Sequence, residues 1–205
     1  MYALRWKGVE VHNTPDILAT MTPIVEALEQ LGVPYYIGGS VASSVYGLPR
    51  LTIDVDLVAD LRLEHVKPLV KLLQATYYID DDMIRDAIRW RSSFNMIHQD
   101  TFLKVDVFIP KSRLFDQEEL NRVQTKVLEG NDHPFYVASP EGTILNKLEW
   151  YRMGGEVSDR QWNDILGVLK VQGTALDMDY LQRWAADLKV TDLLERALVD
   201  AGLKE

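Results

Sequence analysis

The sequence contains no cysteine. This absence excludes disulfide bonds, zinc–thiolate sites and cysteine nucleophiles, and it is typical of proteins from reducing compartments. The sequence also lacks any stretch near the roughly 18 consecutive apolar residues that a membrane-spanning helix needs. Its first segment, MYALRWKGVEVHNTP, has no apolar core of signal-peptide length. We therefore expect a soluble, cytoplasmic protein without a membrane partner.

Positive charge is scarce as well. The chain has 22 lysines and arginines against 31 aspartates and glutamates, which gives a formal net charge of −9. An acidic chain has no general attraction for phosphate backbones, so a nucleic-acid partner would need a local basic patch. With 205 residues, 47% of them hydrophobic, the chain can bury the core of one large domain, or of a domain with a smaller appendage.

Hydrophobic periodicity divides the chain into two parts. Up to about residue 138, helical and strand patterns alternate, whereas from Ser139 onward the patterns are helical only. Helices are expected at 14–31, 40–46, 63–73, 80–90, 141–153, 158–171, 176–187 and 190–201. Strands are expected at 33–37, 51–59, 94–98, 102–109, 122–128 and 134–138. The sequence thus predicts an α/β (α+β) domain over 1–138 followed by a helical domain over 139–205.

Carboxylates interrupt two of the predicted strands. Asp54 and Asp56 lie two residues apart, so their side chains share one face of the strand. If strand 102–109 lies alongside, Asp106 sits beside this pair at roughly 5 Å. At that distance each pair of carboxylates repels by on the order of 3 kcal/mol. A divalent cation removes this repulsion, since Mg²⁺ prefers carboxylate oxygens and shares them with substrate phosphates.

A glycine-rich turn precedes the first of these strands. Gly38, Gly39 and Ser40 follow an apolar run and open a short predicted helix. Glycines let main-chain N–H groups approach a phosphate, and the positive end of the helix points at the same place. Ser40 adds a hydroxyl donor. With the acids nearby, the pattern predicts a nucleotide-handling site with two-metal chemistry.

Each motif also has a purely structural interpretation. A Gly-Gly-Ser sequence is often an ordinary turn, and an Asp-x-Asp sequence can belong to an edge strand that turns its acids toward water. Asp106 could form an ion pair with Lys104 or with Arg50. The occurrence of all three motifs in this order favours the functional interpretation.

The motifs together resemble those of a known group of enzymes. The segment GGS at 38–40, followed by RLTIDVDL at 50–57 and by the distant Asp106, resembles the DNA polymerase β-type nucleotidyltransferase superfamily. Within that superfamily, the segments GGS and RLTIDVDL are similar to those of the AbiEii-like branch. A second block in the helical half agrees with that branch. Its residues are Ser139, Pro140, Glu141, Lys147, Leu148, Arg152, Asp159, Arg160 and Asp164. The resemblance covers about residues 33–170.

The resemblance implies a mixed β-sheet with flanking helices, Mg²⁺ (or Mn²⁺) as cofactor, and transfer of a nucleoside monophosphate from a nucleoside triphosphate to an acceptor hydroxyl. By its analogy, the metal and catalytic residues are Asp54, Asp56 and Asp106. The nucleotide-binding residues are Gly38, Gly39, Ser40, Arg50 and Lys147. Asp106 would bind the catalytic metal and help to activate the acceptor.

Several alternatives stay open. Arg50 either contacts substrate or only neutralises the acids, and Lys147 either reaches the triphosphate or is a solvated helix residue paired with Glu149 or Asp159. Asp159, Arg160 and Asp164 either position Lys147 or the acceptor, or pair with one another. The five tryptophans are assigned to packing.

The acceptor has three candidate classes. A toxin-like enzyme would modify tRNA or a protein and would have an antitoxin partner, whereas a drug-modifying enzyme would act on an aminoglycoside-type small molecule. A non-catalytic module would only bind a nucleotide or a protein. A basic surface at the site would favour RNA, and an acidic cleft would favour a cationic small molecule.

Overall fold

The computed structural model describes residues 4–6, 9–11, 14–50, 52, 54–127 and 133–204, with side chains from residue 17 onward. Parts of two predicted strands lie outside the described residues, namely residues 51 and 53 of strand 51–59 and residue 128 of strand 122–128.

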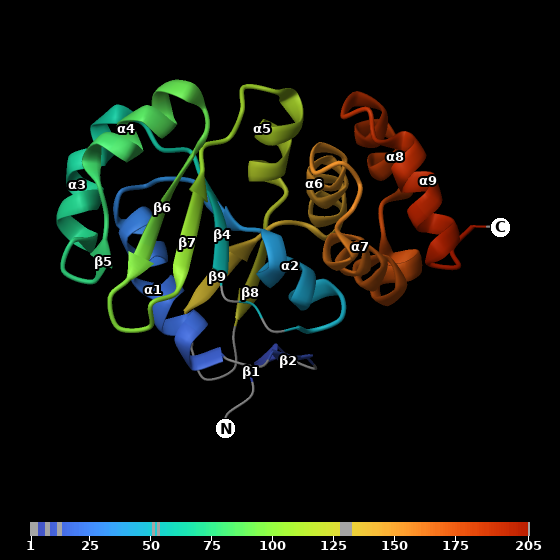
Figure 1. The fold of residues 1–205 in the computed structure, drawn as a ribbon, viewed down its shortest axis with the longest axis horizontal. Coiled ribbons are helices and arrows are strands. Elements are labelled where there is room, and N and C mark those ends of the chain that lie inside the picture. The colour runs from blue at the N-terminus through green and yellow to red at the C-terminus, as the bar shows by residue number, and fades with distance from the viewer. Residues whose placement is uncertain are drawn as a thin grey trace.

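In the described residues, a seven-stranded mixed sheet forms the centre of the molecule (Figure 1), with strand order β5-β6-β7-β4-β3-β9-β8. The pairs β4–β7 and β3–β9 are parallel, and the remaining neighbours are antiparallel. The strands are β3 (Tyr35–Ile37), β4 (Asp54–Ala59), β5 (Tyr77–Tyr78), β6 (Ser93–His98), β7 (Lys104–Phe108), β8 (Gln124–Val127) and β9 (Pro134–Val137). The predicted mixed sheet is confirmed.

Helices cover the sheet and continue beyond it. In Figure 1, α3 and α4 lie at the left of the sheet, while α6 to α9 gather at the right. The helices are α1 (Thr14–Gln30), α2 (Gly39–Tyr46), α3 (Leu63–Leu73), α4 (Asp81–Trp90), α5 (Leu114–Asn121), α6 (Pro140–Met153), α7 (Asp159–Gln172), α8 (Met178–Asp187) and α9 (Thr191–Asp200), with a 3₁₀ turn, η1 (Gly173–Ala175). No helix in the described part is long and apolar enough to cross a membrane.

The alternation of apolar and polar residues decides which face of the sheet is charged. In β4, Val55, Leu57 and Ala59 are fully buried, while Asp54 and Asp56 are half-buried on the opposite face. Strand β7 repeats this pattern, with buried valines between more exposed polar positions. A strand shifted by one residue would place carboxylates in the apolar core. Burial of the apolar side chains therefore fixes the register of the strand. The charged face is the one that forms the site.

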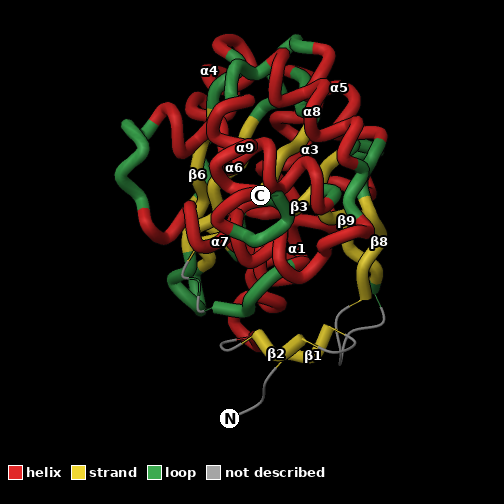
Figure 2. The backbone as a smooth tube through the Cα atoms, turned by 90° about the vertical axis from the view of Figure 1, so that its right-hand side faces the viewer, coloured by secondary structure: helices red, strands yellow, loops and turns green. Residues whose placement is uncertain are grey.

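Five elements of the described residues were not predicted. Two of them are the short strand β5 and the 3₁₀ turn η1. Strands β1 (Leu4–Trp6) and β2 (Val9–Val11) form a separate antiparallel pair, which Figure 2 shows below the helices. Helix α5 has the sequence LFDQEELN, in which polar residues dominate and no apolar stripe is visible. Phe115 of α5 is nevertheless fully buried, and its ring lies 5.4 Å from that of Trp184 on α8. The helical C-terminal part begins where predicted, and its status as a separate domain stays a prediction.

Glu119 is a carboxylate buried beneath α6 and α8. It is 1% exposed. Its Oε1 accepts a hydrogen bond of 2.8 Å from the Tyr180 hydroxyl, while Oε2 has no hydrogen-bond partner in the described part of the chain. Burial raises its pKa to about 7, although Tyr180 and Arg122 oppose the shift. The folded protein therefore favours the protonated, neutral form of this side chain.

We predict that Glu119→Gln stabilises the protein above pH 7. Folded Glu119 keeps its proton up to about pH 7, but an unfolded glutamate releases it near its ordinary value of 4.5. Wild-type stability should therefore fall as pH rises through this window, by on the order of 2–3 kcal/mol. Glutamine carries no such proton, so this loss should vanish in urea unfolding between pH 5 and 8.5. The exposed Glu26→Gln serves as control, and parallel pH profiles for wild type and Glu119→Gln would contradict the prediction.

Candidate functional site

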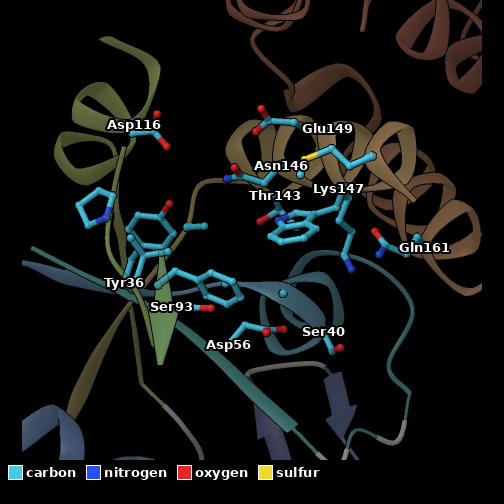
Figure 3. A pocket seen from close by; sticks show the side chains of 18 of the residues that line it. Tyr36, Ser40, Asp56, Ser93, Asp116, Thr143, Asn146, Lys147, Glu149 and Gln161 are labelled. Carbon is cyan, nitrogen blue, oxygen red and sulfur yellow. The ribbon is translucent and has the colours of Figure 1, made fainter. Parts of the chain in front are cut away.

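A pocket of about 700 Å³ opens between the charged face of the sheet and helices α5, α6 and α7. Figure 3 shows Asp56 and Ser40 at its floor, Lys147 reaching down from α6, Gln161 on α7, and Asp116 on α5 across the opening. Of the residues predicted for the site, Gly38, Gly39, Ser40, Arg50, Asp54, Asp56 and Lys147 line this pocket. Asp106 lies on the neighbouring strand and is not part of the lining.

Parallel pairing of β4 and β7 brings the three predicted acids together. Asp56 lies directly opposite Asp106, and Asp54 lies opposite Lys104. The proximity of Asp106 to the Asp54/Asp56 pair is therefore confirmed. The Asp54 carboxylate also accepts a hydrogen bond of 2.9 Å from the Thr52 hydroxyl.

Burial and the clustering of these acids raise the pKa of Asp56. Burial, followed by the charges of Asp54 and Asp106, raises its pKa to about 6. Lys147 and a hydrogen bond from the Ser40 main-chain N–H pull the pKa down, but they do not cancel the shift. Two neighbouring carboxylates thus leave a local excess of negative charge.

The glycine turn packs directly against these acids. The Gly38 N–H donates to the Asp56 main-chain carbonyl at 2.9 Å, which ties the turn to β4. Gly39 has φ +53°, and a Cβ at this position would overlap the Asp56 carboxylate. Only glycine permits both this backbone conformation and this close approach. The N-terminus of α2 is thereby held beside the acidic face.

On the side of the pocket formed by α6 and α7, Asp164 binds both Arg50 and Lys147. Its carboxylate accepts two hydrogen bonds from Arg50, of 2.7 and 2.8 Å, and one of 2.8 Å from Lys147 Nζ. Arg50 also donates to the Ser40 hydroxyl at 2.8 Å. Among the alternatives for Asp164, the structure supports the one in which it positions Lys147. Burial pushes the pKa of Asp164 upward, but the hydrogen bonds and charges of Arg50 and Lys147 outweigh it and lower that pKa.

The donor set fits a divalent ion only in part. In the described residues, no group of three or more His, Cys, Asp or Glu side chains is arranged to hold a metal. Asp106 is paired instead with Lys104, at 2.6 Å between Oδ2 and Nζ, which is one of the two ion pairs considered from the sequence. The Asp54 and Asp56 carboxylates can provide two oxygen ligands to one divalent ion, and the charge of that ion would relieve their mutual repulsion.

Some pocket residues were missed from the sequence. Thr143, Asn146 and Trp150 line the pocket from the same face of α6 as Lys147. Thr143 lies four residues before Lys147 and Trp150 three residues after it, and this spacing was the available signal. Trp150 is 48% exposed and contacts Phe108 edge to face, at 5.8 Å between ring centroids.

The assignment of all five tryptophans to packing was therefore wrong for two of them. Trp150 lines the pocket, and Trp90 at the end of α4 is 73% exposed. Trp162 and Trp184 are buried, as expected.

Charges of both signs line the pocket, with a positive excess. The cationic lining residues are Arg50, Arg91, Lys111, Arg113, Lys147 and Arg160, and the acidic ones are Asp54, Asp56, Asp116 and Glu149. At the end farthest from β4, Arg113 forms hydrogen bonds with both Asp116 and Glu149. The pocket is therefore not an acidic cleft, although the chain as a whole is acidic.

Solved structures share this architecture. A complex of ANT(2'')-Ia with adenylyl-2''-tobramycin matches with a TM-score of 0.55 and 15% identity, covering 84% of this chain and 97% of that one. The solution structure of the antibiotic-resistance factor ANT(2'')-Ia matches with a TM-score of 0.52 and 17% identity, covering 84% and 94%. The chain has the nucleotidyltransferase fold. An antigenic nucleotidyltransferase-like protein from Paracoccidioides brasiliensis also has this fold, with a TM-score of 0.51, 17% identity and coverage of 92% and 94%.

No protein-family model matches the sequence, and no curated protein does. The nucleotidyltransferase fold is thus established by structure, and membership of the AbiEii-like branch stays a prediction.

We predict that Gly39→Ala destabilises the protein by more than the strain of placing alanine at a positive φ. The methyl group would collide with the Asp56 carboxylate. We expect a loss of about 3 kcal/mol or more in the free energy of unfolding. Gly32→Ala is the matched control, because Gly32 also has positive φ (+64°) but a Cβ there meets nothing within 4 Å. Equal losses in the two variants, measured by urea unfolding, would contradict the predicted collision.

Asp164→Asn should destabilise the fold strongly. The substitution leaves Lys147 and Arg50 without their shared anion in a largely buried place, which costs on the order of 3 kcal/mol. The exposed Asp159 lies on the same helix, and Asp159→Asn should cost less than about 1 kcal/mol. Thermal and urea unfolding at pH 7 measure both. A small effect of Asp164→Asn would mean that the ion pairs contribute little.

Proposed function

We propose that this protein transfers a nucleoside monophosphate from a nucleoside triphosphate to an acceptor hydroxyl, with Mg²⁺ or Mn²⁺ as cofactor. The proposal rests on one observation: acidic residues and cationic residues face each other across one pocket. Asp54 and Asp56 lie on the sheet side, and Arg50 and Lys147, which share the Asp164 carboxylate, lie on the helical side. A metal–triphosphate complex has the matching pair of charges, a cation next to anionic phosphates.

The acidic residues would hold the cofactor. Asp54 and Asp56 would provide carboxylate ligands, and Asp106 would complete a second site in the two-metal arrangement that the resemblance implies. When bound, the metal supplies positive charge to the reacting phosphate and to the acceptor oxygen. The Asp106 carboxylate lies opposite Asp56 in the sheet, and there it would help to take up the proton of the acceptor hydroxyl.

The cationic residues would hold the phosphates. Lys147 Nζ and the Arg50 guanidinium are both fixed by Asp164, so they enter the pocket in set orientations. Fixed cations lose little conformational entropy when a phosphate binds. The N-terminus of α2, with Ser40, adds main-chain and hydroxyl donors at the floor of the pocket.

The pocket charges favour an anionic acceptor. Cations outnumber acids in the lining, and the two acids farthest from β4 are both engaged by Arg113. A polycationic drug would need acidic groups that are free to bind it. Among the acceptors considered, RNA such as tRNA therefore fits this pocket better than an aminoglycoside-type molecule. An AbiEii-like, toxin-like role with an antitoxin partner agrees with an RNA acceptor, whereas a protein acceptor or a non-catalytic binding module would be alternative outcomes of the test.

Label transfer tests the proposal. Each α-³²P nucleoside triphosphate is incubated with the protein, Mg²⁺ and a lysate, which is then separated into RNA, protein and small molecules. Wild type should label the RNA fraction. Asp54→Asn and Asp56→Asn should lower the rate at least 100-fold, because the metal ligands are lost.

Asp100→Asn is the matched control, because Asp100 is exposed in the turn between β6 and β7 and is not part of the pocket lining. It should label RNA as wild type does. Label that enters only the small-molecule fraction would show that the acceptor is a small molecule and not RNA. A complete absence of Asp54-dependent label with every nucleotide would favour a binding module.

A further inference from the structure

A lysine stands within the acidic group on the sheet. In the parallel register of β4 and β7, Lys104 lies opposite Asp54, and Asp106 lies opposite Asp56. Lys104 and Asp106 are two residues apart, so all four side chains lie on one face of two adjacent strands. The backbone alone therefore places an ammonium group beside three carboxylates.

The side chains make use of this placement. Lys104 Nζ lies 2.6 Å from Asp106 Oδ2. Asp106 itself is 20% exposed, while the lysine side chain is 48% exposed. On the other flank of β7, strand β6 places the uncharged Asn95 opposite Asp106 and Ile97 opposite Lys104. Lys104 is thus the cation that the sheet itself supplies to this cluster.

We propose that Lys104 is an internal counter-ion that holds Asp106 in the nucleotide-free protein, so that a divalent ion engages Asp106 only by displacing the ammonium group. This inference rests on the proposed function, because it concerns the metal of that reaction. It accounts for the finding that three acids share one face of β4 and β7 while no described group of three is arranged to hold a metal.

The exposure of Lys104 makes the displacement feasible. A half-exposed ammonium group can leave its partner and regain its hydration, which a buried one could not do cheaply. A divalent ion brings twice the charge of the lysine to the same carboxylates. The third acid would therefore join the site when a metal arrives, and the nucleotide would favour that step by adding phosphate ligands.

Binding of Mn²⁺ in the absence of nucleotide tests the inference, with calorimetry or the electron paramagnetic resonance signal of free Mn²⁺ as readout. Lys104→Met removes the ammonium group and should tighten Mn²⁺ binding by about tenfold or more. Lys104→Arg keeps the charge and should bind like wild type. Lys71→Met, an exposed lysine on α3, is the control for loss of a distant positive charge.

A double-variant comparison separates competition between Lys104 and the metal for Asp106 from the general electrostatic effect of removing a positive charge. The gain from Lys104→Met should disappear when it is made on an Asp106→Asn background. A gain of the same size on both backgrounds would overturn the inference, and so would equal Mn²⁺ affinity of Lys104→Met and wild type. In both cases the proposed function would stand, whereas a lack of Mn²⁺ binding by every variant, with or without a nucleoside triphosphate, would overturn both.

Discussion

The salt bridges of Asp164 join the separate parts of the site. The aspartate comes from α7, Lys147 comes from α6, and Arg50 comes from the segment before β4 and reaches Ser40 on α2. Burial of such charges costs several kcal/mol, and this cost is offset only when the hydrogen bonds are well formed. Because one carboxylate meets two cations, the three side chains keep one net positive charge beside the pocket. The interaction that links α6 and α7 to α2 and to the segment before β4 therefore also makes one wall of the pocket positive.

The sheet provides the opposite sign. Asp54, Asp56 and Asp106 carry three negative charges against the single positive charge of Lys104, so an excess of negative charge faces the positive wall. The raised pKa of Asp56, at about 6, is the local consequence of this excess together with burial. A ligand that suits such a pocket must bring positive charge to the sheet and negative charge to the helices. This complementarity in charge is the physical basis of the proposed metal–nucleotide site, and it holds whatever the acceptor is.

Sequence patterns could predict the parts of this site that local rules control. Alternation in β4 placed Asp54 and Asp56 on one face, and the glycine turn with its following helix was visible from spacing alone. The partners of these groups were beyond such rules, because Arg50 and Asp164 are 114 residues apart in sequence. Trp150 and the buried Trp162 look alike in a helical pattern, since the spacing that makes a core also makes a pocket wall. Helix α5 was missed because its buried positions include Glu119, a residue type that normally marks a solvent-facing surface.

The chain twice places a carboxylate against a glycine near the start of a helix, with different outcomes. Asp56 packs on Gly39 at the start of α2, and Glu119 packs on Gly142 in the first turn of α6, where a Cβ would overlap the carboxylate in both cases. Helix N-termini favour negative charge, yet burial raises the pKa of both acids, to about 6 and about 7. Asp56 opens onto a pocket in which a cation can neutralise it. Glu119 is sealed beneath Tyr180, so a proton is the cation available to it. Access to solvent therefore decides which of these two carboxylates can serve a reaction and which one serves the fold.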